Sequence, residues 1–376
     1  MNVLITGANG FIGNNLQLHL AERKDVHVVC FTREHSAAQL PELLAGVDFI
    51  FHLAGINRPQ DPQEFVEGNA SLTQSLCDAV ANVAVATCKK IPVVCSSSIQ
   101  ADRDNAYGQS KRAAENALFA LQRDHGVPVH VFRLPNVFGK WCKPNYNSAV
   151  ATFCYNIARD LPIQINDPSA ALTLVYVDDV LERFIQLMDG AEAAADDDGF
   201  AIIVTPQYST TVGALAAQIH AFKESRSTLL TECVGVGLMR ALYATYVSYL
   251  PVESFAYPVQ QHADARGVFV EMLKTPDCGQ FSYFTANPGI TRGGHYHHSK
   301  TEKFLVIKGQ ARFKFRHMRT GETFELMTNG AKAEIVETVP GWTHDITNMG
   351  EDEMVVMLWA NEVFDRARPD TFACKV

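Results

Sequence analysis

The stretch from residue 289 to residue 309, GITRGGHYHHSKTEKFLVIKG, most constrains what this chain can fold into. His295 and His297 alternate along a strand-like segment, so both side chains can point to the same face of a sheet. Glu302 follows close behind them. Imidazole and carboxylate groups together suit a divalent first-row metal, zinc above all. The stretch therefore predicts a metal site carried by β-strands.

This stretch and the later segment GWTHDITN resemble the cupin barrels over about residues 257–376. In the second motif Pro340 directly precedes Gly341, where one residue usually separates them. The resemblance implies an all-β jelly-roll barrel, which short alternating runs and turn sequences such as NPG and RTGE also favour. A metal-free cupin with a histidine-lined pocket is the alternative. The motif positions are Gly289, His295, His297, Glu302, Gly309, Gly341, His344 and Asn348, and the implied metal ligands are His295, His297, Glu302 and His344.

The chain begins with a second, different feature. In NVLITGANGFIGNN an apolar run is followed by Gly7, Gly10 and Gly13, and then by a helical pattern. A strand, a glycine turn and a helix N-terminus place backbone N–H groups and the positive end of the helix dipole against a pyrophosphate. This context favours a dinucleotide-binding turn over an incidental one.

Arg33 indicates which dinucleotide is bound. The second strand-like run, HVVCF, leads to Thr32 and Arg33, where an acidic residue would hold the ribose 2′-OH of NAD. A guanidinium instead suits a 2′-phosphate. We therefore expect NADPH, with a solvated surface arginine as the alternative.

Two further segments carry groups for proton transfer to a carbonyl oxygen. The strand-like run VVCSSSIQ (93–100) ends in hydroxyls, and Tyr107 and Lys111 follow it in a YxxxK pattern. Residues four apart share one helix face. An ammonium near a phenol favours proton exchange between that phenol and a carbonyl or alcohol oxygen, and a serine hydroxyl can bind the same oxygen.

These N-terminal segments resemble the extended short-chain dehydrogenase/reductase family over roughly residues 1–240. TGANGFIG, HLAG, SSS, YGQSK, RLPNVFG and VYVDDV stand in the family's order. The resemblance implies a Rossmann-type doubly wound α/β sheet. It also implies a catalytic set of Ser98, Tyr107 and Lys111, with Ser97 as the second choice of serine. The implied cofactor contacts are Gly7, Asn9, Gly10, Phe11, Ile12, Gly13, Arg33, Leu53, Ala54, Tyr107 and Lys111.

The same resemblance assigns two asparagines. Asn136 matches the position that contacts a nucleotide-sugar substrate, and Asn69 matches the helix asparagine that supports the active-site lysine. Relatives often carry an arginine shortly before the VYVDDV segment to hold the substrate diphosphate, but here the segment is DPSAALTLVYVDD. Diphosphate contacts must therefore come from elsewhere, with Lys140 and Lys143 as candidates.

The C-terminal segments DARGVFVEML, RGGHYHH and EKFLVI also resemble the dTDP-sugar 3,5-epimerases, which use the cupin barrel without metal. That resemblance implies nucleotide contacts at Arg266 and Glu271, a general base at His295 and an enolate-stabilising lysine at Lys303. Removing a proton beside a ketone needs both a base and stabilisation of the enolate. A metal could replace the lysine as Lewis acid, although a closed tetrahedron of protein ligands favours a structural metal. The family's tyrosine acid has no counterpart here, and the remaining candidates are Tyr283 and Tyr296.

Composition sets the broad class of the protein. The chain has 376 residues, enough for two domains, and a net charge of −9, which argues against binding nucleic acid or an anionic membrane. No stretch reaches the roughly 18 apolar residues of a membrane span. Nine cysteines without CxxC spacing, and a Met1 that leads directly into VLITG, favour a cytoplasmic protein with reduced thiols. We expect a reductase domain at 1–245, a connector at 244–258 and a cupin domain at 257–376.

The whole order, reductase first and metal cupin last, resembles the bifunctional capsular-polysaccharide enzymes of the CapF type and their O-antigen relatives. The resemblance implies two reactions on a UDP-2-acetamido-2,6-dideoxy-4-keto-hexose. The cupin would epimerise C3, and the reductase would then reduce the C4 ketone with NADPH to give UDP-2-acetamido-2,6-dideoxy-L-talose. A homodimer is expected. The alternatives are a single-activity reductase whose cupin only dimerises and a redox-sensing regulator, and the retained Tyr/Lys pair argues against the regulator.

Overall fold

A computed structural model describes residues 1–59, 61, 63–192, 203–255, 257–297, 300–318, 320–339, 341–367 and 369–376. The chain divides into two compact units. The first holds Met1–Ile219 and Arg240–Leu250, and the second holds His220–Met239 and Pro251–Val376. Residues 220–239, which the sequence analysis assigned to the reductase domain, therefore belong to the second unit. The division after Leu250 falls inside the predicted connector.

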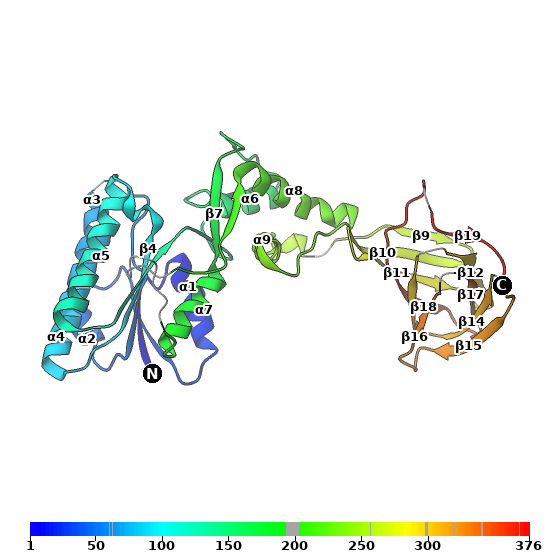
Figure 1. The fold of residues 1–376 in the computed structure, drawn as a ribbon, viewed down its shortest axis with the longest axis horizontal. Coiled ribbons are helices and arrows are strands. Elements are labelled where there is room, and N and C mark those ends of the chain that lie inside the picture. Colours follow the sequence, from blue (N-terminus) through cyan, green and yellow to red (C-terminus); the bar gives the residue numbers. More distant parts are fainter. Residues whose placement is uncertain are drawn as a thin grey trace. The chain divides into compact units, whose positions relative to one another are not determined.

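The first unit is built on a parallel sheet in the order β2-β1-β3-β4-β5, and helices lie on both sides of this sheet in Figure 1. Its strands are β1 (Asn2–Thr6), β2 (His27–Phe31), β3 (Phe49–His52), β4 (Val93–Ser98) and β5 (Val129–Leu134). The chain passes from β1 to β2 on one side and continues from β3 to β5 on the other. Ligands of such sheets bind at this switch point, outside the carboxyl ends of the strands.

Helices cover both faces of the sheet because its strands are apolar on both faces. Val3 and Ile5 face a core closed by α1 (Phe11–Ala21) and α7 (Val177–Met188). Leu4, between them, faces a second core. The helices of that second core are α2 (Leu40–Leu43), α4 (Leu72–Thr87) and α5 (Ala106–His125). The predicted Rossmann-type doubly wound sheet is confirmed.

Further elements complete the chain up to residue 254. A small sheet has the order β6-β7-β8, with β6 (Asn136–Phe138), β7 (Ala171–Tyr176) and β8 (Tyr208–Thr211). Helix α8 (Val212–Thr228) begins in the first unit and ends in the second. The remaining helices are α3 (Gln63–Phe65), α6 (Ala149–Ala158), α9 (Gly237–Ser248), the 3-10 helices η1 (Ala37–Gln39), η3 (Ile99–Asp102) and η4 (Val252–Ser254), and the π-helix η2 (Val66–Ser71).

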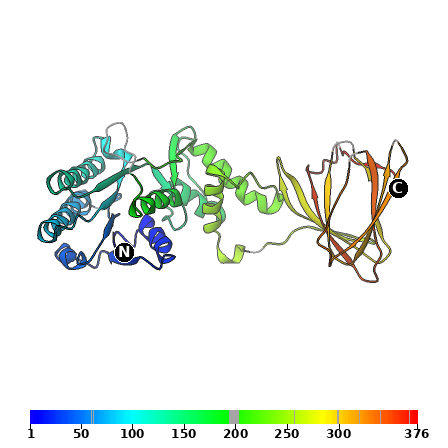
Figure 2. The ribbon, with the colours of Figure 1, turned by 60° about the horizontal axis from the view of Figure 1, so that its bottom comes forward.

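The second unit contains two antiparallel sheets that face each other (Figure 2). One has the order β16-β13-β18-β11-β10-β9 and the other β15-β14-β17-β12-β19. Their strands are β9 (Gln261–Asp264), β10 (Gly267–Thr275), β11 (Gly279–Ala286), β12 (Thr291–Tyr296), β13 (Glu302–Lys308), β14 (Gln310–His317), β15 (Thr323–Asn329), β16 (Ile335–Glu337), β17 (Trp342–Asn348), β18 (Met354–Ala360) and β19 (Phe372–Ala373). The predicted all-β C-terminal domain is confirmed.

The core of the β domain lies between the two sheets. Phe304 and Val356 come from the first sheet, and Phe313 and Ile346 come from the second. Alternate residues on each strand point into this core, so neighbours along a strand face opposite sides. None of the described helices combines the length and apolar character needed to cross a membrane.

Candidate active sites

A glycine turn opens the first site at the carboxyl end of β1. Gly7 has φ +69°, and a Cβ on it would lie 2.6 Å from the backbone nitrogen of Ala54. A Cβ on Gly13, inside α1, would lie 2.4 Å from the carbonyl oxygen of Gly7. Only glycine allows the helix to begin this close to the strand. The helix N-terminus, with Gly10 as its cap, thus forms a cradle that fits a dinucleotide pyrophosphate.

The other predicted cofactor residues lie around this turn. The backbone N–H groups of Leu53 and Ala54, just past β3, donate to Thr6. Arg33 is exposed at the end of β2, in a turn where the Thr32 N–H donates to His35 Nδ1 over 3.2 Å. Its guanidinium is accessible to a ligand. Of the rest, the carbonyl of Asn9 accepts from Asn14, and Phe11 and Ile12 pack against the core beneath α1.

Lys111 and Asn69 meet at Gly55, just beyond β3. A Cβ on Gly55 would lie 3.0 Å from Asn69 Oδ1 and 3.1 Å from Lys111 Nζ. Lys111 is buried, and its ammonium donates to the Ser96 carbonyl over 3.1 Å. Asn69 Oδ1 accepts from the Ile56 N–H over 2.8 Å. These contacts hold the lysine beside the strand ends, where its α5 neighbour Tyr107 is half-buried.

The structure separates the two candidate serines. The hydroxyl of Ser97 donates to the buried carboxylate of Glu115, which also pairs with Arg133 over 2.7 Å. Ser98 ends β4, and its oxygen accepts from the Gln100 N–H over 3.2 Å. The Ser98 hydroxyl proton therefore stays available to an added carbonyl oxygen, whereas that of Ser97 is already committed.

The predicted substrate residues of this unit have contrasting surroundings. The Asn136 side-chain amide donates to the Thr173 carbonyl over 3.0 Å. Lys140 Nζ lies 3.0 Å from Asp178 Oδ1, so its charge is already compensated. Lys143 instead lies over an aromatic ring, with Nζ 5.1 Å from the Tyr146 centroid. Of the two predicted lysines, Lys143 is the better placed to bind an anion.

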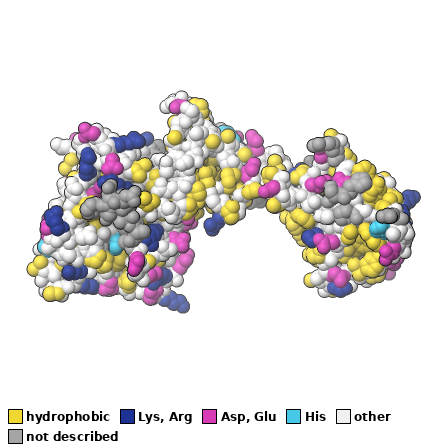
Figure 3. Space-filling view, viewed as in Figure 1, with side chains coloured by type: hydrophobic (Ala, Val, Ile, Leu, Met, Phe, Trp, Pro, Cys, Tyr) yellow, Lys and Arg dark blue, Asp and Glu magenta, His cyan; other side chains and the backbone are white. Residues whose placement is uncertain are grey.

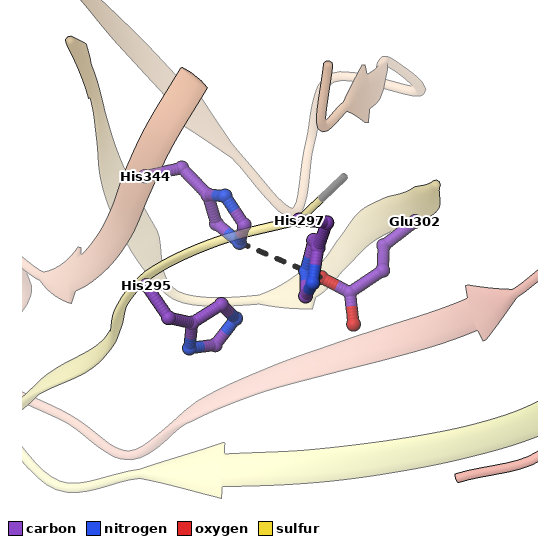
Figure 4. Close-up of side chains that lie close together, drawn as sticks. All are labelled: His295, His297, Glu302 and His344. Carbon is purple, nitrogen blue, oxygen red and sulfur yellow. Dashed lines mark hydrogen bonds and ion pairs between the residues drawn. The ribbon is translucent and has the colours of Figure 1, made fainter. Parts of the chain in front are cut away.

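The second site is a cluster of three histidines and one glutamate inside the β domain (Figure 4). One ligand atom from each of the four residues lies within 4.8 Å of the others. His295 is on β12, Glu302 opens β13 and His344 is on β17, while His297 directly follows β12. All but His295 are buried. The structure thus brings together all four residues of the predicted metal set.

The cluster contains donor atoms that the protein itself does not satisfy. Both ring nitrogens of His344 are buried without a hydrogen-bond partner among the described residues, and Nε2 lies 3.5 Å from Glu302 Oε2. Buried polar atoms are normally satisfied. His297 Nδ1 contacts the Asp370 carbonyl, an arrangement that fixes the imidazole so that Nε2 faces Glu302 at 3.2 Å. Three imidazoles and one carboxylate so arranged fit a divalent cation.

Electrostatics keep the cluster in the protonation state that binds a metal. Burial alone would raise the pKa of Glu302, but the neighbouring imidazoles of His297 and His344 and the charge of Lys300 outweigh burial and hold that pKa well below its usual range. Burial, with His344 adding to it, lowers the pKa of His295 to about 4. Near neutral pH the glutamate is therefore ionised and His295 is neutral, as metal ligands must be.

The expected lysine is not at this cluster. Lys303 is exposed and pairs with Glu337 across β13 and β16. Glu302 precedes it on β13 with its side chain inward, so alternation turns Lys303 outward. The assignment of Lys303 to the site is therefore corrected. Lys300, which the sequence analysis missed, is buried in the loop before β13, with Nζ 3.4 Å from Glu302 Oε1. No periodicity applies in that loop, so the sequence pattern could not indicate it.

The remaining predicted residues of the β domain make their own contacts away from the inward-facing side chains of the cluster. Arg266 is exposed and pairs with Asp264, and Glu271 pairs with Lys274 over 2.9 Å. Tyr283 alternates with the buried Ser282 and Phe284 on β11. Tyr296 stacks on Phe372 and alternates with the two cluster histidines, so neither tyrosine points into the site. Pro340, singled out in the second cupin motif, lies outside the described residues.

Comparison with known proteins bears on both units. Residues 3–202 match the NAD dependent epimerase/dehydratase family, and residues 262–372 match the polysaccharide biosynthesis C-terminal domain. A UDP-2-acetamido-2,6-beta-L-arabino-hexul-4-ose reductase of Pseudomonas aeruginosa is 64% identical over 376 residues, which span 100% of this chain and 99% of that protein.

Solved structures agree with these matches. The capsular polysaccharide assembling protein CapF from Staphylococcus aureus has a TM-score of 0.90 and 42% identity, with 100% of both chains covered. A UDP-glucuronic acid 4-epimerase from Bacillus cereus, in complex with NAD, has a TM-score of 0.54 and 18% identity over 66% of this chain and 98% of that one, a likeness of fold alone. The chain therefore belongs to the NAD-dependent epimerase/dehydratase family, and within it to the CapF-type proteins that add the polysaccharide biosynthesis C-terminal domain.

Proposed function

We propose that the first unit is an NADPH-dependent reductase of a UDP-2-acetamido-2,6-dideoxy-4-keto-hexose. The observation that carries this proposal is the 64% identity, over the whole chain, with a reductase whose name specifies a UDP-linked 2-acetamido-2,6 sugar with a keto group at C4. The glycine cradle and the Ser98, Tyr107 and Lys111 set at the same strand ends supply what such a reduction needs.

Each catalytic side chain has a distinct part in this reduction. Bound NADPH supplies hydride to C4. The Tyr107 hydroxyl donates a proton to the C4 oxygen as that oxygen gains charge. The Ser98 hydroxyl binds the same oxygen and orients the carbonyl. Lys111, held between Asn69 and the Ser96 carbonyl, places a positive charge beside the phenol and can bind the nicotinamide ribose.

Arg33 sets the preference for NADPH in this proposal. Its exposed guanidinium, at the end of β2, can bind a 2′-phosphate through two parallel hydrogen bonds. The Arg33→Ala variant should lose affinity for NADPH and not for NADH. Steady-state KM values for both cofactors, measured with the 4-keto sugar, test this preference. Equal KM increases for the two would contradict it.

We further propose that the β domain, as a cupin, epimerises C3 of the same sugar before reduction. The C3 proton is acidic only because the C4 ketone can take up the charge as an enolate, so catalysis needs a base and a positive charge near that oxygen. The His295, His297, Glu302 and His344 cluster would hold a divalent metal, zinc by its donor set, and a bound metal would supply Lewis-acid polarisation of the ketone. In the alternative without a metal, His295, the least buried of the four, is the candidate base, because an imidazole nitrogen bound to a metal could not accept the C3 proton.

The presence of both reactions in one chain would have a thermodynamic advantage. Epimerisation at C3 is reversible as long as the ketone remains. Reduction at C4 removes the ketone that makes C3 acidic, so the new configuration is trapped. The product of this sequence is UDP-2-acetamido-2,6-dideoxy-L-talose.

A second candidate function for the β domain is structural: it would hold two copies of the chain together as a dimer without catalysing a reaction. Four protein ligands can close a tetrahedron, which is typical of structural zinc. In addition, the outer face of one sheet carries Phe281, Leu305, Ile335, Met357 and Trp359, and hydrophobic side chains gather on the β domain in Figure 3. Whether the β domain is an epimerase or structural, we propose that this face packs against the same face of a second copy in a homodimer. Sedimentation of an Ile335→Glu variant tests it, because a monomer is expected and an unchanged dimer would contradict it.

The proposed setting is the cytoplasm, with a UDP-amino sugar as partner and neither nucleic acid nor a membrane. All nine cysteines are free, as expected in a reducing compartment. The reductase half is tested by NADPH consumption that depends on the UDP-4-keto sugar. Wild-type protein should consume NADPH with this sugar and not without it. Absence of sugar-dependent consumption would overturn the proposal.

A further inference from the structure

Two cations from different loops of the first unit converge on one aromatic ring. The guanidinium carbon of Arg58 lies 5.9 Å from the centroid of the Tyr146 ring, and Lys143 Nζ lies 5.1 Å from it. Both cations are exposed, and within the described part of the chain neither contacts a carboxylate. Lys140, in the same loop as Lys143, is instead paired with Asp178. Among the described residues, therefore, no carboxylate compensates the charges of Arg58 and Lys143.

Arg58 lies in the loop that frames the catalytic pair. This loop follows β3, passes Gly55 against Lys111 Nζ and leads to Phe65, whose ring centroid is 5.6 Å from that of Tyr107. Arg58 is three residues beyond Gly55, and an extended chain spans at most about 3.6 Å per residue, so their Cα atoms lie within about 11 Å. The loop that carries one of the two cations is therefore next to the proposed reaction centre.

The loop that carries Lys143 and Tyr146 is fixed rather than free to relax. The Tyr249 hydroxyl donates to the Cys142 carbonyl, and the Asn145 N–H donates to Thr152 Oγ1 over 2.9 Å. Trp141 and Asn145 have φ values of 68° and 53°, in the left-handed region that non-glycine residues rarely adopt. Such conformations persist only where the surroundings impose them, and they concentrate at ligand sites.

A UDP-sugar brings a diphosphate with two negative charges to this edge of the sheet. The segment before VYVDDV has no arginine to meet them, and Lys140 is already paired. We propose that Arg58 and Lys143 form the diphosphate subsite of the reductase, with Tyr146 holding the two side chains together. The inference rests on the proposed function. An arginine can bind phosphate oxygens through two hydrogen bonds and a lysine adds a point charge. An anion between them also relieves the repulsion between two like charges.

The test uses the full-length protein and the variants Arg58→Gln, Lys143→Gln and both together. Each single variant should raise KM for the UDP-4-keto sugar about tenfold, because a hydrogen bond to a charged group is lost. The kcat should change little, since these contacts are made equally before and during the reaction. The KM for NADPH should stay the same. Lys140→Gln is the matched control, with the same charge change in the same loop, and should leave the sugar KM within about twofold.

A binding measurement keeps the test independent of turnover. Calorimetry should show that the wild-type protein binds UDP about 100-fold more tightly than uridine, and that the double variant loses most of this difference. An unchanged difference in the double variant would overturn the subsite, as would a rise confined to the KM for NADPH. If wild-type protein fails to reduce the sugar but the UDP preference depends on Arg58 and Lys143, the proposed function fails and the subsite stands.

Discussion

The two candidate sites differ in which part of the chain forms them, the backbone in one and side chains in the other. The cofactor cradle of the first unit is mostly backbone, and it exists because Gly7 and Gly13 lack a Cβ. The cluster of the β domain is made of side chains, and it exists because His295, His297 and His344 aim imidazoles at Glu302. The first site should therefore be damaged by adding atoms and the second by removing them. The comparison also implies that each reaction can be abolished while the other persists.

The largest expected effect separates the two reactions. Tyr107→Phe removes the proposed proton donor and should lower kcat for reduction by about a thousandfold, within the usual range for general acids. The β domain keeps its cluster, so deuterium exchange at C3 should continue at the wild-type rate. Calorimetric NADPH binding serves as the control for folding. A loss of C3 exchange in this variant would contradict the assignment of reduction and epimerisation to separate units.

The next effect concerns the metal. His344→Ala removes one of four donors and should weaken metal affinity at least about 100-fold, since even supporting residues of metal sites contribute 10- to 100-fold. Chelator competition measures this directly. His262→Ala, which removes an exposed histidine from β9 of the same domain, is the matched control. Equal metal affinity in the two variants would show that the cluster is not the binding site.

Adding a single methyl group should damage the first site. In Gly13→Ala the new Cβ would lie 2.4 Å from the Gly7 carbonyl oxygen, so α1 must move away from β1. We expect a loss of about 1–3 kcal/mol in the free energy of unfolding, together with weaker NADPH binding. Gly235→Ala is the control, because nothing lies within 4 Å of that position. Urea titration of both variants checks the result, and equal midpoints would contradict the close approach.

Acid should destabilise the first unit through a buried histidine. His52 lies between the hydroxyls of Thr6 and Thr73, and burial, aided by the charge of Lys111, lowers its pKa to about 3. The unfolded chain binds a proton there below pH about 6.5 and the folded chain does not, so stability falls as pH falls from about 6.5 towards 3. The slope from this group is at most about 1.4 kcal/mol per pH unit.

Urea titrations of wild type and His52→Gln across this pH range measure that contribution. The variant should show the shallower dependence, because it carries no group to protonate at this position. Hydrogen exchange of peptides from β1 and β3 locates the effect in the first unit. Parallel pH dependences for the two proteins would rule out His52 as the source.

The smallest expected effect tests the corrected lysine. Lys303→Met should leave C3 exchange within about twofold and cost less than about 1 kcal/mol, because the exposed pair with Glu337 contributes little. Lys300→Met, the matched variant, removes the buried ammonium 3.4 Å from Glu302 and should change both exchange and metal affinity. The opposite ranking, with Lys303 more sensitive, would restore the expectation from the epimerase resemblance.

Motif order was sufficient to predict the fold class and to bring the candidate residues of the first site to one edge of the sheet. Gly7, Leu53 and Ser98 each stand at the carboxyl end of a strand or just beyond it, and parallel strands bring those ends to one edge. The metal cluster was predictable for a similar reason, because His295 and His297 share one strand face by alternation. Ser98 was preferred to Ser97 by the family resemblance alone, because the contact of Ser97 with Glu115 of α5 could not be predicted from the sequence.

The incorrect predictions concern positions where a shift of one residue, or the path of a single loop, determines where a side chain lies. Because side chains alternate along a strand, Lys303 lies on the opposite face of the sheet from Glu302. The alignment of EKFLVI with a family motif does not show which of the two faces points into the domain. Lys300 and Arg58 lie in loops, where no periodicity constrains the side chain. The meeting of Arg58 with Lys143 depends on two segments far apart in sequence. Residues 220–239, which were expected in the reductase domain, belong to the second unit instead.

The central claim, two sites with separate reactions on one sugar, is tested most directly by NMR in D₂O with purified protein and a UDP-2-acetamido-2,6-dideoxy-4-keto-hexose. Without NADPH we expect deuterium at C3 and an intact ketone. With NADPH we expect deuterium at C3, an inverted C3 and a reduced C4. A reduced product that keeps its C3 proton and configuration would contradict the account and leave the β domain with a structural role.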